Sequence, residues 1–131
     1  MTQTYVIIGA SRGIGRASAL ALAAPERHLV LASRSADELR QVADAVRAQG
    51  AEATVVPCDV TAEPHVRRLI EAAAGITGQI DLLLNSAGGA IVAPFEELSL
   101  ADWETTLRVG LTSVFLTCKH AVAHMPSGSL I

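Results

Sequence analysis

The sequence predicts a doubly wound α/β fold, in which helices cover both faces of a parallel β-sheet. Strand and helix patterns alternate along all 131 residues, and the strands are short apolar runs of the kind that a sheet buries on both faces. A glycine-rich turn joins the first strand to the first helix. No internal repeat, low-complexity tract or linker interrupts the alternation, so we expect residues 1–131 to form a single domain.

The N-terminal part contains two predicted strand–helix units. Residues 5–8 are a short run rich in β-branched side chains, and an Ala/Leu-rich helix follows over residues 13–24, up to the first proline. Residues 28–33 form a second buried strand. The helix over residues 36–49 is amphipathic, with apolar side chains at i, i+3, i+4 and i+7, and Gly50 follows as a typical helix C-cap.

A third unit and a further strand follow. Residues 53–57 form the third strand, and Thr61 is the expected N-cap of a helix that runs to about residue 74. Residues 80–84 are an apolar run that we interpret as the fourth strand.

A long apolar helix is predicted over residues 100–124. Ser99 and Asp102, three residues apart in "ELSLADWE", form a capping box at its start. The last stretch, "GSLI", begins a strand at about Leu130, where the sequence stops. We therefore expect a fold that is truncated at the start of its fifth strand.

Composition argues against several functional classes. Hydrophobic residues make up 50% of the chain, yet every apolar run is short, so no transmembrane span is expected. The N-terminus lacks the basic start of a secretory signal. A formal net charge of -3 with scattered arginines argues against a nucleic-acid partner. Cys58 and Cys118 lie far apart without metal-binding spacing, so we interpret them as buried thiols of a cytoplasmic protein.

The first motif with chemical content is "IIGASRGIG". Gly9, Gly13 and Gly15 lie between a strand and a helix, where backbone amides can approach a pyrophosphate and the helix N-terminus carries partial positive charge. A side chain at these positions is expected to hold the phosphate away. The alternative is a tight turn that binds nothing, but the position at the start of a βαβ unit favours nucleotide binding.

Five stretches together resemble the short-chain dehydrogenase/reductase family along the length of the chain. The glycine spacing Gly-xxx-Gly-x-Gly is followed at the expected distances by "LASRS", "CDVT", "NSAG" and "DWETTLRVGLTSVFLTCKHAVAHM". Ile8 replaces the family's usual Thr, and Ser86 replaces its usual second Asn. The resemblance implies a nicotinamide dinucleotide cofactor and a Rossmann-type sheet with strand order 3-2-1-4, which right-handed crossovers also favour.

The end of the second strand indicates which cofactor is bound. A nucleotide-binding fold presents here either an acid for the ribose 2′-hydroxyl or a base for a 2′-phosphate. Ser33 and Arg34 occupy this place with no Asp or Glu, and Arg12 in the glycine loop adds a second cation. Either arginine alone is more often a solvated surface charge. The two together favour NADP, with NAD the less favoured cofactor.

The resemblance also assigns the remaining cofactor contacts. It places Asp59 and Val60 at the adenine, and Asn85, Ala87 and Gly88 beside the ribose. The complete predicted cofactor-binding set, which includes no metal ligand, is Gly9, Ser11, Arg12, Gly13, Ile14, Gly15, Ser33, Arg34, Asp59, Val60, Asn85, Ala87 and Gly88.

The family's catalytic motif does not occur in this sequence. In the family, the strand that begins at "GSLI" leads to a substrate-binding serine and a Tyr-xxx-Lys motif, whose tyrosine exchanges a proton with the substrate. The single tyrosine, Tyr5, and the single lysine, Lys119, cannot form that motif. Gly110 stands where family members often carry a catalytic Asn. We therefore predict no catalytic residue, and no turnover, for these residues alone.

Other candidate sites are disfavoured. His120 and His124 are four residues apart on the long helix, but no acidic third ligand shares that spacing, so we interpret them as packing and surface histidines. Ser11 and Ser86 lack a nearby His/Asp constellation for nucleophilic catalysis.

The sequence thus predicts the cofactor-binding half of an NADP(H)-dependent short-chain oxidoreductase for a small carbonyl or alcohol substrate. The alternatives are a non-catalytic nucleotide-binding or interaction module, and a half-protein completed by a second chain. A downstream Ser and Tyr-xxx-Lys after Ile131 would indicate an enzyme, whereas a stop codon would favour the module. The substrate cannot be named, because the family's substrate loop lies beyond these residues.

A homo-oligomer is also predicted. The long helix carries apolar side chains on more than one face, the fourth strand lacks a neighbour, and this helix commonly builds the family's dimer interface. We interpret Trp103 and Phe115 on this helix as packing residues.

Overall fold

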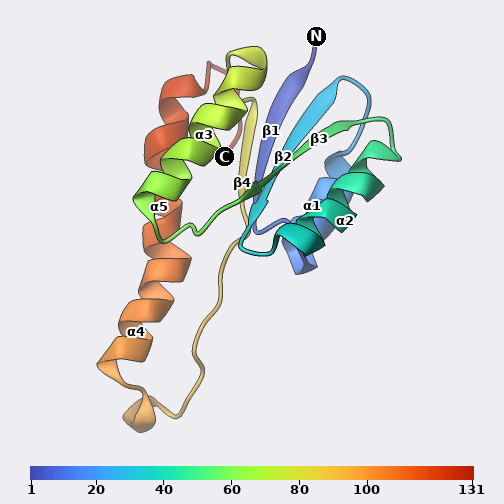
Figure 1. Cartoon of the computed structure of the whole chain (residues 1–131). Coiled ribbons are helices and arrows are strands. Elements are labelled where there is room, and N and C mark those ends of the chain that lie inside the picture. Colours follow the sequence, from blue (N-terminus) through green and yellow to red (C-terminus); the bar gives the residue numbers. More distant parts are fainter.

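The computed structural model describes residues 1–131 and contains a four-stranded parallel sheet with helices on both faces (Figure 1). The strand order is β3-β2-β1-β4, and every neighbouring pair is parallel. The predicted α/β fold class and strand order are therefore confirmed. The strands are β1 (Gln3–Ile8), β2 (Arg27–Ser33), β3 (Glu52–Pro57) and β4 (Leu82–Asn85).

Two apolar cores, one on each face of the sheet, hold these layers together. The covering helices are α1 (Gly13–Leu22), α2 (Ala36–Arg47), α3 (Glu63–Thr77) and α5 (Ser113–Ala121). Side chains alternate along each strand, so Val6 and Val30 pack on the face of α3 and α5, whereas Ile7 and Leu31 pack on the face of α1 and α2 (Figure 1). Burial on both faces explains why the strands are almost continuously apolar.

The register of the strands brings their carboxyl ends to one edge of the sheet. Ile8, at the end of β1, pairs with Ala32 of β2 and with Asn85 of β4. Ala32 in turn pairs with Val56 of β3. The turns that follow all four strands therefore lie side by side, as they do where open α/β sheets bind ligands.

The start of α3 differs from the expectation. Its N-cap is Ala62, and no side chain caps it. Thr61, the predicted cap, instead donates both its backbone N–H (2.9 Å) and its hydroxyl (2.7 Å) to Oδ1 of Asp59. Thr61 was a plausible cap by residue type, but a nearby carboxylate competes for its hydrogen bonds. The predicted cap is therefore wrong, and the helix ends at Gly78, which adopts φ 89°.

The long C-terminal helix is a continuous rod with a π-turn in its middle (Figure 1). Its segments are α4 (Leu100–Leu107), the π-turn η2 (Arg108–Thr112), α5 and the 3₁₀ turn η3 (Val122–His124); a further 3₁₀ turn, η1 (Phe95–Glu97), precedes it. The predicted capping box is confirmed, since Asp102 N–H donates to Ser99 Oγ (3.1 Å) and Ser99 N–H donates to Asp102 Oδ2 (3.3 Å). Within η2, the Ser113 N–H reaches back to the Arg108 carbonyl. The sequence predicts uninterrupted α-helix there, so the π-turn is a difference from the prediction.

The last residues lie beside β4, where a fifth strand was expected to begin. Leu130 forms a parallel bridge with Leu82. Its carbonyl accepts from the Leu83 N–H (2.9 Å), and its own N–H donates to the Asp81 carbonyl (3.0 Å). The edge of β4 is therefore partly covered within these residues, contrary to the expectation of an unpaired edge.

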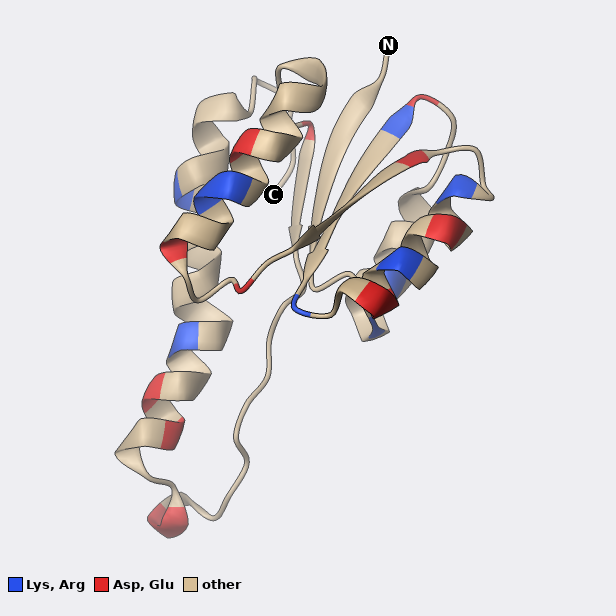
Figure 2. Cartoon of the chain, viewed as in Figure 1, with Lys and Arg blue, Asp and Glu red and all other residues tan.

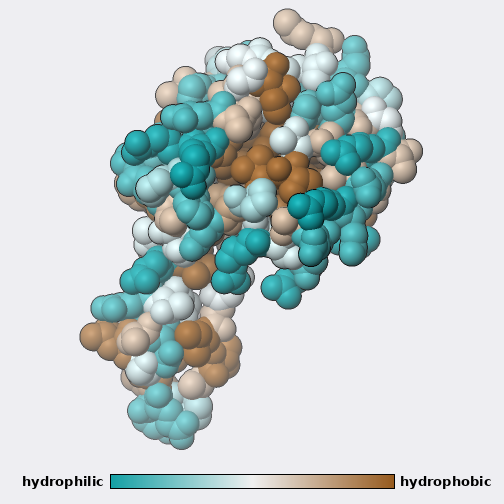
Figure 3. Space-filling view, viewed as in Figure 1, coloured by the Kyte–Doolittle hydropathy of each residue, from teal (hydrophilic) through white to brown (hydrophobic).

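Charged and apolar surfaces are distributed unevenly. The strands are nearly free of charge, while Lys, Arg, Asp and Glu lie mainly on the helices and in the turns (Figure 2). Apolar residues form patches on the projecting part made by α4 and the loop before it, and a further patch at the centre of the main body (Figure 3). Trp103 and Phe115 are 51% and 62% exposed, so the interpretation of them as packing residues is wrong for packing within the chain. No helix combines the length and the apolar character that crossing a membrane requires.

Candidate functional site

A cleft of about 940 Å³ opens at the carboxyl edge of the sheet. The turns after all four strands contribute to its walls, and the π-turn region closes it from the side of the long helix. Of the thirteen predicted cofactor-binding residues, eleven line this cleft: Gly9, Ser11, Arg12, Gly13, Ile14, Ser33, Arg34, Asp59, Val60, Ala87 and Gly88. The structure thus brings together residues that are up to 79 positions apart in the sequence (88 minus 9).

The three glycines of the first turn have different roles. A Cβ on Gly9 would lie 2.6 Å from the backbone of Ser86 and Ala87, and one on Gly15 would lie 2.0 Å from the Gly9 carbonyl oxygen. These two glycines allow close packing of backbone on backbone. Gly13, at φ 56°, has no atom within 4 Å of such a Cβ and faces open space. Only Gly13 therefore leaves room for a ligand, a distinction that the spacing of the glycines does not reveal.

The start of α1 offers unpaired hydrogen-bond donors. The N-cap residue, Arg12, is extended (φ -157°), and no side chain caps the helix. The backbone N–H groups of residues 11–15 donate to no other group of the chain. Together with the helix dipole, these amides form a binding place for an anion such as a pyrophosphate.

Two of the arginines that line the cleft, Arg12 and Arg34, form no ion pair within the chain. Both are exposed. Ser33, the last residue of β2, accepts a hydrogen bond from the Ser35 N–H (3.2 Å). No acid follows β2 directly, although Glu38 of α2 also lines the cleft. Free guanidinium groups of this kind can bind an anionic group.

Asp59 is held ionised in the cleft. The hydrogen bonds from the Thr61 hydroxyl and N–H lower the pKa of the Asp59 carboxyl, and the positive charge of Arg34 lowers it further. Both Thr61 bonds go to Oδ1, so Oδ2 is left to accept from a ligand. The exocyclic amino group of an adenine is a suitable donor for this oxygen.

Cys58 forms part of the apolar wall of the cleft. Burial raises the pKa of its thiol to about 11, and the negative charge of Asp59 acts in the same direction. The thiol is therefore protonated at neutral pH and serves as a small apolar side chain. The second cysteine, Cys118, is half-buried, so only Cys58 fits the expected description of a fully buried thiol.

Two of the predicted residues do not line the cleft. Gly15 lies beneath the turn, packed against the Gly9 carbonyl. The side chain of Asn85 turns towards α5, where its Oδ1 accepts a hydrogen bond from the Thr117 hydroxyl at 2.6 Å. Both residues support the cleft from behind.

Eight lining residues were not among those predicted. Four lie directly beside a predicted residue, one lies on α2, and three come from the long helix and its π-turn. Nothing in the local sequence indicates that the long helix reaches over the cleft. The eight are Ser35, Glu38, Cys58, Thr61, Ser86, Thr105, Arg108 and Val109. The quoted motifs "CDVT" and "NSAG" already contained Cys58, Thr61 and Ser86.

The single tyrosine and the single lysine lie outside the cleft. The Tyr5 hydroxyl donates to Gln3 Oε1 (2.9 Å), and the Arg27 guanidinium lies 5.2 Å from the centre of the Tyr5 ring. Lys119 pairs with Glu63 (2.9 Å), as does His120 (2.8 Å). Hydrogen bonds from Lys119 and then His120 lower the pKa of the Glu63 carboxyl to about 2. No cluster of three His, Cys, Asp or Glu side chains lies close enough to hold a metal ion.

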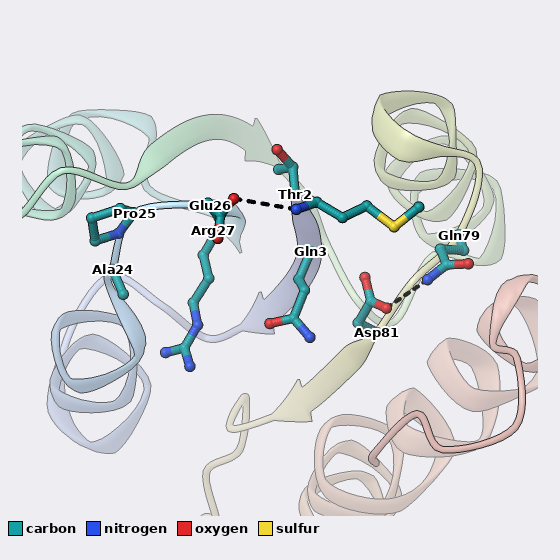
Figure 4. Close-up of a pocket in the computed structure, with 9 residues that line it drawn as sticks. Thr2, Gln3, Ala24, Pro25, Glu26, Arg27, Gln79 and Asp81 are labelled. Carbon is teal, nitrogen blue, oxygen red and sulfur yellow. Dashed lines mark hydrogen bonds and ion pairs between the residues drawn. The ribbon is translucent and has the colours of Figure 1, made fainter.

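A second hollow, of about 410 Å³, lies at the opposite, amino-terminal edge of the sheet (Figure 4). Its polar groups are already paired: the Met1 ammonium contacts Glu26 (3.2 Å) and the Gln79 amide donates to Asp81 (2.7 Å). The guanidinium of Arg27 donates to the Leu22 carbonyl. Because these groups satisfy one another, the hollow presents no converging set of free donors or acceptors.

Comparison with known proteins agrees with this geometry. Residues 3–131 match the family model described as short chain dehydrogenase. A 3beta-hydroxysteroid dehydrogenase of Eggerthella lenta is 32% identical over 123 residues, which cover 93% of this chain and 47% of that protein. A D-threitol dehydrogenase of Mycolicibacterium smegmatis is 36% identical over 114 residues, which cover 87% of this chain and 44% of that protein. The chain spans about half the length of these curated relatives.

Solved structures superpose closely on the chain. A short-chain dehydrogenase/reductase variant from Serratia marcescens matches with a TM-score of 0.91 and 30% identity, covering 98% of this chain and 53% of that one. An alcohol dehydrogenase from the archaeon Thermococcus sibiricus, complexed with 5-hydroxy-NADP, matches with a TM-score of 0.88 and 32% identity. That match covers 95% of this chain and 53% of the archaeal one.

Proposed function

Because this chain belongs to the short-chain dehydrogenase family, we propose that it binds NADP(H) as the cofactor-binding half of an oxidoreductase acting on a carbonyl or alcohol. The observation that carries the choice of NADP is the unpaired pair Arg12 and Arg34 at a strand end without an acid. The archaeal relative with a bound NADP derivative supports the same choice.

Each part of the cleft suits one part of the cofactor. The free amides of residues 11–15 would hold the pyrophosphate, with Gly13 giving it room. Arg12 and Arg34 would hold the 2′-phosphate, and Asp59 with Val60 would border the adenine. The turn after β4 would lie along the nicotinamide end. When bound, the nicotinamide exchanges a hydride with the substrate carbon.

Calorimetric titration of the chain with NADPH and NADH tests the cofactor choice. Each charged hydrogen bond to the 2′-phosphate contributes about 1.5–3 kcal/mol, so NADPH should bind at least about tenfold more tightly. Replacing Ser33 by Asp together with Arg34 by Ala should reverse the preference. Arg67→Ala is the matched control, because Arg67 is an exposed arginine of α3 outside the cleft. Equal affinities in the unaltered chain would refute the assignment.

We also propose that these residues alone do not catalyse turnover. Neither Tyr5 nor Lys119 lines the cleft, and Gly110 has no side chain to order a relay water. A positioned proton donor contributes about a hundredfold to ten-thousandfold in rate. NADPH consumption by the purified chain should therefore stay at background with ketones, aldehydes and quinones. Turnover that disappears in Gly13→Trp would show that a proton donor within these residues had been overlooked.

Self-association through the long helix is the remaining proposal. Leu111 and Phe115, both on the long helix, are 65% and 62% exposed. Further apolar surface is exposed around α4 (Figure 3). A second copy of the chain is the proposed partner. Light scattering should show a dimer or larger species that Phe115→Glu converts to monomer. A monomer at all accessible concentrations would contradict this proposal.

A further inference from the structure

We propose that Thr117 is a positioning residue for one end of the cofactor cleft, acting through Asn85 on the turn that follows β4. The inference rests on the proposed dinucleotide binding. Thr117 lies on α5, is fully buried (0% exposed) and does not itself line the cleft. Its influence on a ligand must therefore pass through the residues that it holds.

The contact between α5 and β4 is a short hydrogen bond. The Thr117 hydroxyl donates to Asn85 Oδ1 at 2.6 Å, whereas its distance to the Val114 carbonyl within the helix is 3.1 Å. The other end of the Asn85 amide reaches only Cys118 Sγ, at 3.9 Å, and sulfur is a weak acceptor. Thr117 is thus the principal partner of the Asn85 side chain.

Asn85 is followed directly by the wall of the cleft. It is the last residue of β4, and the N–H of the next residue, Ser86, donates to the Ile8 carbonyl at 3.0 Å. The Ser86–Ala87 backbone then packs on Gly9 so closely that no Cβ would fit between them. Rotation or displacement of Asn85 would therefore move the wall at Ser86 and Ala87 relative to the glycine turn.

This wall lies at one end of the cleft only. Ser33 and Arg34 follow β2, whereas Ala87 and Gly88 follow β4, and β1 separates these two strands in the sheet. Two strand spacings amount to about 10 Å. A dinucleotide whose 2′-phosphate lies at Arg34 must extend across this distance to reach Ala87, but its adenosine half alone does not. Loss of the Thr117 hydroxyl should therefore weaken binding of the dinucleotide and leave binding of the adenosine half unchanged.

The deciding experiment compares Thr117→Val with Thr117→Ser. Valine keeps the shape of threonine but removes the hydroxyl, so Asn85 Oδ1 loses its donor, while serine keeps the donor. Calorimetry measures two probes: NADPH, and adenosine 2′,5′-bisphosphate, which lacks the nicotinamide half. We expect Thr117→Val to bind NADPH about threefold to tenfold more weakly and the bisphosphate normally, the size expected of one neutral hydrogen bond. Thr117→Ser should bind both probes normally.

Thr4→Val is the matched structural control. Thr4 is also fully buried, and its hydroxyl hydrogen-bonds Thr77 at 2.7 Å, but it lies at the opposite edge of the sheet. If loss of a buried hydroxyl acts only through general stability, Thr4→Val will weaken NADPH binding as Thr117→Val does, and the inference is wrong. Thermal unfolding of both variants shows how much stability each has lost.

A double-mutant cycle tests the route through Asn85. Asn85→Ala should weaken NADPH binding selectively, and adding Thr117→Val to it should cause no further loss. Additive losses would refute the route. If Thr117→Val does not fold, the selectivity of Asn85→Ala between the two probes decides the question in the same way. An unaltered chain that binds neither probe would instead refute the proposed function, whereas equal loss of both probes in Thr117→Val refutes only the role of Thr117.

Discussion

Two regions of the molecule differ in how far their apolar side chains are buried. The first is the sheet with α1, α2 and α3, and the second is the long C-terminal helix with the loop before it. In the first region, residues 1–85, the large strand side chains such as Ile7, Leu29 and Leu31 are completely buried. In the second region, residues 86–124, α4 contains no buried residue, and Phe95 is 89% exposed. Most large apolar side chains of the first region are buried, with Ile14 (77% exposed) an exception, whereas those of α4 and of the loop before it are exposed.

α5 shows where the two regions meet. Three of its four buried residues, Leu116, Thr117 and Ala121, face α3 and β4, while side chains such as Phe115 remain exposed. The loop before the helix and the π-turn are likewise held by few contacts within the chain, such as the hydrogen bond from the Ile91 N–H to Thr106 Oγ1 (3.2 Å). The cleft is built mainly on the first region, which supplies most of the residues that line it. The apolar side chains of α4 and of the loop before it stay exposed within residues 1–131.

The largest expected effect on stability lies in the first region, at Gly15. Gly15→Ala would place its Cβ 2.0 Å from the Gly9 carbonyl oxygen, so the turn or α1 must move, at a cost of about 3 kcal/mol or more. Denaturant unfolding measures this loss. Gly75→Ala in α3 is the control, since its Cβ meets no atom within 4 Å and it should stabilise by about 0.5–1 kcal/mol. Similar stability in the two variants would contradict the close packing of the glycine turn.

A direct contrast between the regions comes from Leu31 and Phe115. Leu31→Ala removes a completely buried side chain and should lower the free energy of unfolding by about 2–5 kcal/mol. Phe115→Ala removes a side chain that is 62% exposed and should change it by less than about 0.5 kcal/mol in dilute, monomeric samples. A large loss from Phe115→Ala under these conditions would show that the long helix is packed within the chain.

A substitution at Gly110 tests the π-turn of the second region. A Cβ there meets no atom within 4 Å, so Gly110→Ala should stabilise the helix by about 0.5–1 kcal/mol. Gly128→Ala is the opposite case, because Gly128 has φ 95° and alanine should destabilise it. Thermal unfolding compares the two. A destabilised Gly110→Ala variant would mean that the π-turn depends on glycine.

The smallest expected effect concerns the ion cluster that joins the two regions. Glu63 pairs with Lys119 and His120, and its pKa of about 2 lies below the ordinary value of 4.5. The lowered pKa means that the cluster stabilises the fold above about pH 4.5 and ceases to do so as the pH falls towards 2. Glu63→Gln should therefore lower the melting temperature slightly at pH 7 and not at pH 2. Glu71→Gln, an exposed and unpaired glutamate on the same helix, should change it at neither pH.

Local patterns in the sequence were enough to predict most of the fold. The near-continuous apolar runs predicted the four strands, with ends within two residues of those observed, because burial on both faces leaves few other residues acceptable. The box at Ser99 and Asp102 was also predictable, since its partners are three residues apart and need no other element. The predicted residues around the glycine turn come together because the carboxyl ends of parallel strands share one edge.

The hydrogen-bond partner of a polar side chain and the exposure of an apolar one could not be predicted from local patterns. Both depend on which residue, distant in the sequence, lies opposite that side chain in the fold. The Thr61 hydroxyl can cap α3 or donate to the Asp59 carboxylate, and it donates to Asp59. The Asn85 side chain can face the cleft or Thr117, and it accepts a hydrogen bond from Thr117. Phe115 has the apolar character of a core residue, yet the chain places nothing over it. Residue type and spacing specify what a side chain can do, and only the packed chain brings the competing partner within reach.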